Sequence, residues 1–254
     1  MRSTKALLYL AAALLLTPPQ AAQAQNTRHQ TASDYYNRGN ERQKKGDLKG
    51  ALEDYTFAIT FDPRFAQAYN NRGVAHFLQR EFEEAIADYT KAIELKSDYA
   101  EAWNNRGNAR QDSGDLDGAI ADYDAAVKLR PDYAIAWHSR GSAHHQKKDL
   151  TSAISDYTRA IEINPQYASA FHNRGSAYQE QGALHKAEQD YSQAIKLTPR
   201  RALSWAQRGL VRLRLGENDK AEVDFAECLK LDPSLKPSLY NSVQAVKNQR
   251  VAGH

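Results

Sequence analysis

The sequence contains one cysteine among its 254 residues, Cys228, and therefore cannot form a disulfide within the chain. Its fold must be stabilised by packing alone. The sequence also lacks a strong excess of one charge, because 34 Lys and Arg side chains face 31 Asp and Glu side chains, a formal net charge of +3. Neither this balance nor any basic stripe points to nucleic acid as a partner.

No apolar run in the sequence is long enough to span a membrane, which takes about 20 residues. The longest run covers residues 6–16 and is ended by Pro18 and Pro19. The basic residues Arg2 and Lys5 precede it. A positive start before a short apolar run is typical of a secretory signal peptide and not of a membrane anchor.

The expected signal peptide covers residues 1–24, because Ala22-Gln23-Ala24 has the small-x-small pattern that precedes a cleavage point. The mature chain would then begin near Gln25, in the periplasm or outside the cell. Residues 25–31 are polar, and we expect a disordered lead-in there. No membrane span is predicted in the mature protein.

Four kinds of residue recur every 34 positions, without insertion or deletion, across most of the chain. The glycine row is Gly39, Gly73, Gly107, Gly141, Gly175 and Gly209. The alanine row is Ala51, Ala85, Ala119, Ala153, Ala187 and Ala221. One aromatic row is Tyr55, Tyr89, Tyr123, Tyr157, Tyr191 and Phe225, and the other is Tyr35, Tyr69, Trp103, Trp137, Phe171 and Trp205. Rows that stay in register over this length indicate tandem repeats.

These rows divide the chain into six units of 34 residues: 32–65, 66–99, 100–133, 134–167, 168–201 and 202–235. In the second unit, residues 66–79 and 83–96 are rich in Ala, Glu, Arg and Leu, which predicts two helices. Glycine follows the first helix in four units, where a left-handed helix end is expected, but Arg80 and Lys148 take this place in the other two. One helix pair is too small to bury its own apolar face, so neighbouring pairs must stack.

Residues 236–248 continue the helical pattern beyond the sixth unit. Leu239, Val243 and Val246 fall on one side, which predicts a helix that covers the exposed apolar face of the last repeat. Residues 236–254 are therefore expected to form a capping helix with its last four residues frayed.

The repeat has an aromatic residue at position 4, Gly at 8, Ala at 20, Tyr or Phe at 24, Ala at 27 and, in five units, Pro at 32. This pattern resembles the tetratricopeptide repeat family. The resemblance implies an all-α fold, a right-handed superhelix or α-solenoid of six helix-turn-helix repeats followed by the capping helix. It also implies a concave groove that holds a protein or an extended peptide.

Repeat position 7 is Arg in every unit, and position 23 is Asp in every unit. The arginines are Arg38, Arg72, Arg106, Arg140, Arg174 and Arg208. The aspartates are Asp54, Asp88, Asp122, Asp156, Asp190 and Asp224. Each Asp follows its Arg by 16 residues and falls on the second helix, so we predict a structural ladder of ion pairs between the helices. The alternative is a row of arginines that grips an acidic ligand, but equal numbers of both charges leave no net charge for such a ligand.

In the family that the repeat resembles, the first helices line the groove, mainly with positions 2, 5, 6, 9, 12 and 13. Position 6 is rich in amides here, and this row is similar to the asparagine ladder of the O-GlcNAc transferase family, whose amides hold a peptide backbone. An amide offers both a donor and an acceptor; the alternative is that these residues are simply solvated. The expected partner-binding residues are Tyr36, Asn37, Asn40, Asn70, Asn71, Phe77, Asn104, Asn105, Asn108, His138, His145, His172 and Asn173.

Three of these residues are histidines that could face one another as metal ligands. His138 and His145 are seven residues apart, about 10 Å along a helix, whereas ligand pairs on a helix are three or four residues apart. We therefore expect no metal site and no cofactor. A second interpretation is that exposed histidines at these places gain charge near pH 6 and make binding pH-dependent.

Motifs for catalysis are missing from the sequence. We find no nucleophile elbow, no Gly-rich phosphate loop, no His-Glu-x-x-His and no catalytic domain outside the repeats, so we expect no enzymatic activity. Cys228 takes a small-residue position and is expected to be a buried, inert thiol. Positions 5 and 9 carry no Lys or Arg in any unit, which argues against capture of a dicarboxylate C-terminus.

We therefore expect a scaffold of the bacterial envelope that binds a peptide or protein in its groove. Two apolar sets would anchor partner side chains or be buried by neighbouring helices: Val74, Phe77 and Leu78, and Leu203, Leu210 and Leu213. One alternative function is a self-assembling module that forms homo-oligomers through the second set. Another is an accessory subunit of an envelope enzyme or secretion system.

Overall fold

The computed structural model describes residues 31–252, and this part of the chain consists of helices and turns without a β-strand. The predicted signal peptide, residues 1–24, lies outside the described residues, as do residues 25–30 and 253–254. Thr31, the last residue of the predicted lead-in, caps the first described helix, because its hydroxyl accepts a hydrogen bond from the Asp34 backbone N–H. The predicted all-α fold is confirmed.

Six helical hairpins follow one another along the chain, one in each 34-residue unit. Their first helices are α2 (Ala32–Lys44), α4 (Ala66–Leu78), α6 (Ala100–Ser113), α8 (Ala134–Gln146), α10 (Ala168–Glu180) and α12 (Ala202–Arg214). Their second helices are α3 (Leu48–Phe61), α5 (Phe82–Leu95), α7 (Leu116–Leu129), α9 (Leu150–Ile163), α11 (Leu184–Leu197) and α13 (Asn218–Leu231). The short 3-10 helix η1 (Pro233–Leu235) leads into α14 (Lys236–Ala252), which runs further than predicted, since fraying was expected from Val251.

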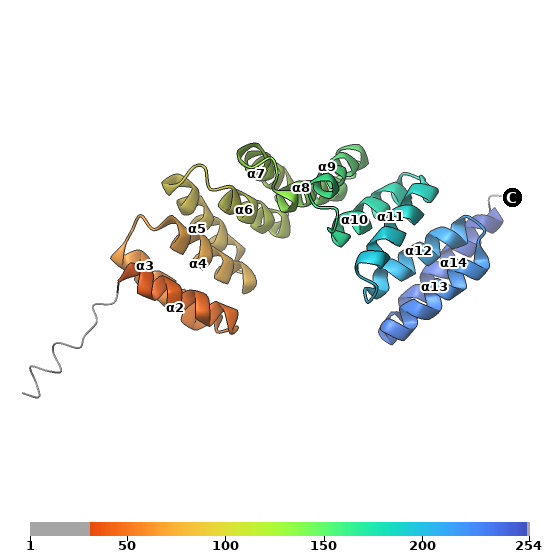
Figure 1. Cartoon of the computed structure of the whole chain (residues 1–254), viewed down its shortest axis with the longest axis horizontal. Coiled ribbons are helices and arrows are strands. Elements are labelled where there is room, and N and C mark those ends of the chain that lie inside the picture. The colour runs from red at the N-terminus through yellow and green to blue at the C-terminus, as the bar shows by residue number, and fades with distance from the viewer. Residues whose placement is uncertain (1–30, 253–254) are drawn as a thin grey trace, which may run out of the picture.

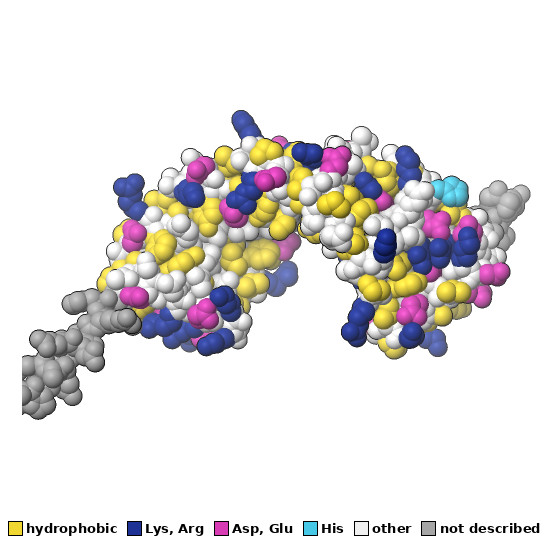
Figure 2. Space-filling view, in the orientation of Figure 1, with side chains coloured by type: hydrophobic (Ala, Val, Ile, Leu, Met, Phe, Trp, Pro, Cys, Tyr) yellow, Lys and Arg dark blue, Asp and Glu magenta, His cyan; other side chains and the backbone are white. Residues whose placement is uncertain are grey.

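The hairpins stack in sequence order into an open arch (Figure 1). The first helices α4, α6, α8 and α10 lie toward the inside of the arch, and the second helices α5, α7, α9 and α11 lie toward its outside (Figure 1). The space-filling view shows the hollowed side between the two limbs (Figure 2). The concave face is thus built mainly from the first helices of consecutive repeats.

The glycine and tyrosine rows meet where the two helices of a hairpin pack together. A Cβ atom on Gly107 would lie 2.6 Å from Cε1 of Tyr123, so a larger residue would push α6 and α7 apart. Tyr123 is fully buried with Ala119 and with Ala143 of the next repeat. Close packing of a large ring against small residues recurs in the other repeats and keeps the hairpins in register.

The turn inside each hairpin requires a left-handed residue after the first helix. Gly114 supplies it with φ of 95°. Arg80 and Lys148 adopt the same conformation, with φ of 63° and 65°, although their Cβ atoms make it unfavourable. The next helix can then begin at a capping residue such as Asp115, whose carboxylate accepts a hydrogen bond from the Gly118 N–H.

Helix α14 packs against α12 and covers the end of the array, as predicted for the capping helix. Leu210 and Leu213 of α12 are buried with Val246 of α14. They therefore lie under the terminal helix and do not line the groove. Val243 stands where the six repeats have glycine, and it is tolerated there because no second helix follows α14 in the described part of the chain.

Candidate functional site

The arginine and aspartate rows form a ladder inside the hairpins. In every repeat the Arg donates from Nε and Nη2 to the two carboxylate oxygens of its Asp, over 2.8–3.0 Å and 2.5–2.8 Å. All six aspartates are buried. This two-bond geometry neutralises the buried carboxylates and uses two of the donor nitrogens of each arginine.

The same arginines also connect neighbouring repeats. Arg106 Nη1 donates to the Thr90 hydroxyl of the preceding repeat at 3.0 Å, and Arg140 Nη1 donates to Asp124 at 2.6 Å. Equivalent bonds join the other consecutive repeats. The row ends at α14, where Ser242 stands in place of the arginine. The ladder therefore runs through the array as one network.

Asn71, at position 6 of the second repeat, is bonded within the protein and does not point freely into the groove. Its Nδ2 donates to Asn40 Oδ1 at 2.8 Å and to the Tyr36 hydroxyl at 3.1 Å. Its oxygen accepts from Asn70 at 3.0 Å. Both amide hydrogens are thus used to join the first and second repeats, so this residue braces the groove.

The same brace recurs further along the array. Asn105 donates to Asn70 Oδ1 at 3.0 Å, and Asn173 Nδ2 lies 2.9 Å from His138 Nε2. In each case position 6 of one repeat meets position 5 of the repeat before it. Asn37 has no preceding repeat and is exposed.

The brace is missing between the third and fourth repeats. Position 6 of the fourth repeat is Ser139, and its shorter side chain makes no hydrogen bond to Asn104. Asn104 is 2% exposed, and its Oδ1 has no hydrogen-bond partner among residues 31–252. Asn104 was expected to contact a partner, but its burial keeps it from the groove surface.

Other polar groove residues hold the buried tyrosines. The Tyr123 hydroxyl lies 2.8 Å from both Asn108 Oδ1 and Gln111 Oε1 and donates its single hydrogen to one of them. Asn40 accepts in the same way from Tyr55 at 2.9 Å. These bonds satisfy the hydroxyl at the inner end of each ring, where burial raises the pKa of Tyr123.

The groove histidines do not gather at one point. His138 is paired with Asn173, and His172 Nδ1 lies 3.0 Å from the Ser204 hydroxyl. Burial, together with the charge of Arg201, lowers the pKa of His138 and of His172 to about 4. They therefore do not gain charge near pH 6, and the pH-dependent interpretation is wrong for these two.

A hollow on the side of the first helices opens between α8 and α10. Its lining residues are Ser142, His145, Gln146, Lys148, Tyr157, His172, Asn173, Ser176 and Glu180. Glu180 bridges the fourth and fifth repeats here, since His145 Nε2 lies 2.8 Å and Lys148 Nζ lies 2.9 Å from its carboxylate. The exposed Gln146 and the half-buried Ser176 lie in the same hollow.

The expected apolar anchors are mostly packed against the protein itself. Phe77 and Val74 pack against the cluster of Ala85, Tyr89 and Ala109. Leu78 and Leu203 remain about half exposed, at 54% and 48%. Leu78 and Leu203 alone therefore offer a partner less apolar surface than the two predicted sets of three residues would have offered.

A further row of groove residues was not predicted. The last position of the first five repeats, position 34, holds Phe65, Tyr99, Tyr133, Tyr167 and Arg201. The Phe65 ring lies 4.9 Å from the Tyr36 ring, and the Tyr167 ring lies 4.9 Å from the His138 ring, so this row packs over position 5. The recurrence of an aromatic residue just before four of the first helices, α4, α6, α8 and α10, was the signal that would have identified this row.

Three tyrosines of this row carry hydroxyls that remain open to a ligand. The hydroxyls of Tyr99, Tyr133 and Tyr167 make no hydrogen bond to another described residue, and all three side chains are half-buried. Burial raises the pKa of Tyr99 to about 12, so its hydroxyl stays protonated and can donate.

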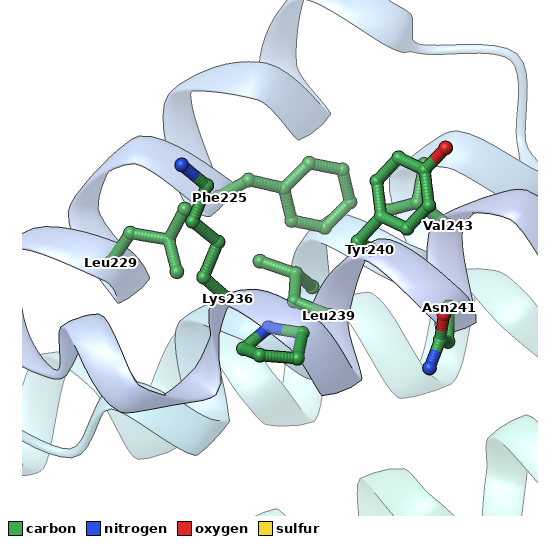
Figure 3. A pocket seen from close by; sticks show the side chains of 8 residues that line it. Phe225, Leu229, Lys236, Leu239, Tyr240, Asn241 and Val243 are labelled. Atoms are coloured by element: carbon green, nitrogen blue, oxygen red, sulfur yellow. The ribbon is translucent and has the colours of Figure 1, made fainter.

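An apolar hollow also lies at the C-terminal end, between α13 and α14 (Figure 3). Phe225 and Leu229 of α13 face Leu239 and Val243 of α14, and the Tyr240 ring stands beside them. The hollow lies along the face of α14 that a second helix would cover in a complete repeat.

Within residues 31–252, no group of three His, Cys, Asp or Glu side chains is placed to hold a metal ion. No helix in the same region is long and apolar enough to cross a membrane. Cys228 is fully buried, and burial raises the pKa of its thiol, which keeps it protonated.

Comparisons with known proteins agree with this architecture. Models described as tetratricopeptide repeat match residues 66–99, 104–168, 156–189 and 202–235, and a model described as TPR repeat matches residues 39–80. None of these models describes an enzyme. No curated protein sequence matches the chain.

Solved structures of the same architecture cover most of the chain. The crystal structure of MamA is 26% identical, with a TM-score of 0.60, and the match covers 65% of this chain and 96% of MamA. YrrB, described as a TPR protein with an unusual peptide-binding site, is 21% identical, with a TM-score of 0.62 and coverage of 78% and 99%. PilF of Pseudomonas aeruginosa is 19% identical, with a TM-score of 0.75 and coverage of 84% and 96%.

The stacked hairpins and their continuous inner face define an α-solenoid. The six hairpins of residues 31–252 are tetratricopeptide repeats, and α14 is the closing helix of this part of the chain.

Proposed function

We propose that this protein is a non-catalytic scaffold that holds an extended peptide, or an extended segment of a protein, on its concave face. The observation that carries the proposal is the in-register inner face, where the first helices of successive repeats bring equivalent side chains into rows. The fold supports it, since the similar YrrB has a peptide-binding site. Repeating side chains at constant intervals suit a ligand that is itself extended and regular.

The braced groove favours binding because it is ordered in advance. Asn71 and Asn105 hold neighbouring repeats together, so the inner face does not have to be fixed when a ligand arrives. A preformed surface avoids the entropy cost of ordering side chains on binding. Groups that remain open, among them the hydroxyls of Tyr99 and Tyr133 and the side chain of Gln146, are then the ones that contact the ligand.

The experiment is a selection of binders from a random library of 12-residue peptides with the purified chain from residue 25 onward. Recovered peptides are measured against two variants of one residue type. Gln146→Trp fills the hollow between α8 and α10, whereas Gln189→Trp adds the same ring on the exposed surface of the second helix α11. We expect Gln146→Trp to weaken binding about tenfold or more and Gln189→Trp to leave it unchanged. Equal affinities for both variants would place the binding site elsewhere.

We also propose that the protein acts in the bacterial envelope after export. The basic start, the short apolar run and the cleavage pattern of residues 1–24 support this location. N-terminal sequencing of the protein from a periplasmic extract should find Gln25 first. A chain that keeps Met1 and stays in the cytoplasm would contradict the proposal.

The alternative function, self-assembly through Leu203, Leu210 and Leu213, has little exposed apolar surface to use. Leu210 and Leu213 are 7% and 5% exposed under α14, so only Leu203 of that set can meet a second copy. We therefore expect light scattering to give the mass of a monomer. A stable dimer or polymer would restore self-assembly as the function.

A further inference from the structure

Arg201 breaks the row of aromatic residues at position 34. The first four members are Phe65, Tyr99, Tyr133 and Tyr167, and Arg201 is the fifth. Its side chain is half-buried, and its Nη1 makes a single long hydrogen bond, 3.3 Å, to the Ser169 hydroxyl. No carboxylate of residues 31–252 lies within ion-pair distance of its guanidinium.

The arginines of the ladder show what Arg201 lacks, although half-buried Arg214 of α12 likewise has no ion pair among residues 31–252. Each arginine of the ladder is matched to an aspartate of its own repeat by two hydrogen bonds, as Arg174 is to Asp190. Arg130, near the same edge of the groove, is paired with Glu101 at 2.5 Å. Arg201 therefore carries a positive charge that no carboxylate of residues 31–252 pairs, and its guanidinium keeps donors free for an anion.

The surroundings of Arg201 are polar but carry no compensating charge. Arg201 holds position 34 of the fifth repeat and His172 holds position 5, the two positions whose rings meet as Tyr167 and His138 in the fourth repeat. Its charge contributes to the lowered pKa of both histidines, so both are neutral beside it. His172 is held by the buried Ser204. An anion at this place would meet one guanidinium and neutral groups around it.

We propose that Arg201 is the carboxylate-binding residue of the groove and that it receives an Asp or Glu side chain of the bound extended peptide. The inference rests on the proposed function, because it names the chemistry of that same ligand. The planar guanidinium matches a carboxylate with two parallel hydrogen bonds. Its half-burial strengthens the pair relative to one in open water. The partner is thus an acidic peptide whose backbone runs along the first helices and whose carboxylate reaches the fifth and sixth repeats.

The test uses the same peptide selection, run in parallel on the wild type, Arg201→Gln and Arg200→Gln. Arg200 is the matched control, because it is adjacent, exposed and equally charged. We expect Asp and Glu to be enriched among peptides selected by the wild type and by Arg200→Gln but not by Arg201→Gln. Arg201→Tyr, which restores the residue found in repeats two to four, should behave like Arg201→Gln and carries the test if Arg201→Gln does not fold.

One selected acidic peptide is then taken into a double-mutant cycle. Arg201→Gln should weaken its binding about tenfold or more, and changing its acidic residue to the amide should weaken it equally. Both changes together should cost no more than either alone. If no peptide is selected by the wild type, the proposed function itself fails. If peptides bind without acidic preference, or if the two single changes add, the assignment of Arg201 fails and the scaffold function stands.

Discussion

Arg106 and Asp122 are joined by two hydrogen bonds, from Nε to Oδ2 at 2.9 Å and from Nη2 to Oδ1 at 2.7 Å, inside the third hairpin. Both residues are buried. A second guanidinium, that of Arg110, approaches the same carboxylate at 2.9 Å. One buried carboxylate therefore accepts hydrogen bonds from two arginines, and it holds α6 against α7.

Asp122→Ala should destabilise the protein far more than Glu101→Ala. Loss of the Asp122 carboxylate leaves a buried guanidinium without its partner, which costs about 3–5 kcal/mol. The Glu101–Arg130 pair has side chains that are 40% and 39% exposed, and such pairs contribute roughly 0–1 kcal/mol. Thermal unfolding of the two variants measures the difference. Equal melting temperatures would show that the ladder does not stabilise the hairpins.

Asn71→Ala should loosen the first repeat without affecting the last. The variant loses two hydrogen bonds to Tyr36 and Asn40, together worth about 2 kcal/mol. Amide hydrogen exchange in α2 and α3 should become about tenfold faster or more, and exchange in α12 should not change. The matched control is Asn37→Ala, since Asn37 holds the same repeat position but is exposed. Identical exchange in both variants would mean that the amides do not brace the array.

Ser139→Asn should stabilise the protein by completing the missing brace. The longer side chain places an amide donor where Asn105 places one for Asn70, and the buried Asn104 Oδ1 gains its partner. One such bond contributes about 1 kcal/mol. Urea unfolding measures the gain, with Ser139→Ala as the control. A variant that is less stable than the wild type would show that the amide does not fit at this junction.

Lys148→Gly should stabilise the turn between α8 and α9. Lys148 has φ of 65°, a conformation that costs a residue with a Cβ atom roughly 1–2 kcal/mol, while glycine adopts it freely. Its exposed ion pair with Glu180 contributes little against this. Lys147→Gly, one residue earlier and with a negative φ of −75°, should instead lower the melting temperature. A drop in both variants would contradict the assignment of strain to position 148.

The half-buried histidines His138 and His172 should make the fold sensitive to acid. Both histidines have a folded pKa of about 4, below the usual value of 6.5. Between these two values the unfolded chain binds protons that the folded chain excludes, so stability falls as the pH drops from about 6.5 toward 4 and is unaffected above that window. His138→Gln combined with His172→Gln should flatten this part of the curve of unfolding free energy against pH. An unchanged slope would mean that the imidazoles are charged in the folded state.

Much of the architecture was readable from the sequence because each hairpin is a local structure. Gly107 and Tyr123 are 16 residues apart and meet inside one hairpin, so the row spacing alone predicts their contact. The pairing of Arg106 with Asp122 has the same separation and follows the same logic. The left-handed Arg80 was also readable, since glycine fills its place in other repeats.

The groove was harder to predict because it depends on how one hairpin is rotated against the next. That rotation brings Asn105 into hydrogen-bonding contact with Asn70 of the preceding repeat, and it buries Asn104. From the sequence alone, Asn104 and Asn105 were both expected to be exposed in the groove. The same rotation also packs Tyr167 at position 34 against His138 at position 5, and it brings the charge of Arg201 close enough to lower the pKa of His172. A spacing of 34 residues shows that these rows exist, but it does not show which of them faces the ligand.

The most direct measurement of where a peptide binds is photo-crosslinking from defined positions. A benzophenone amino acid is placed at Gln146, in the hollow between α8 and α10, or at Gln189, on the exposed side of α11. Each protein is irradiated with a selected 12-residue peptide, and the adducts are identified by mass spectrometry. The concave-face account predicts adducts from position 146 and none from position 189. Adducts formed from position 189, with none from 146, would contradict it.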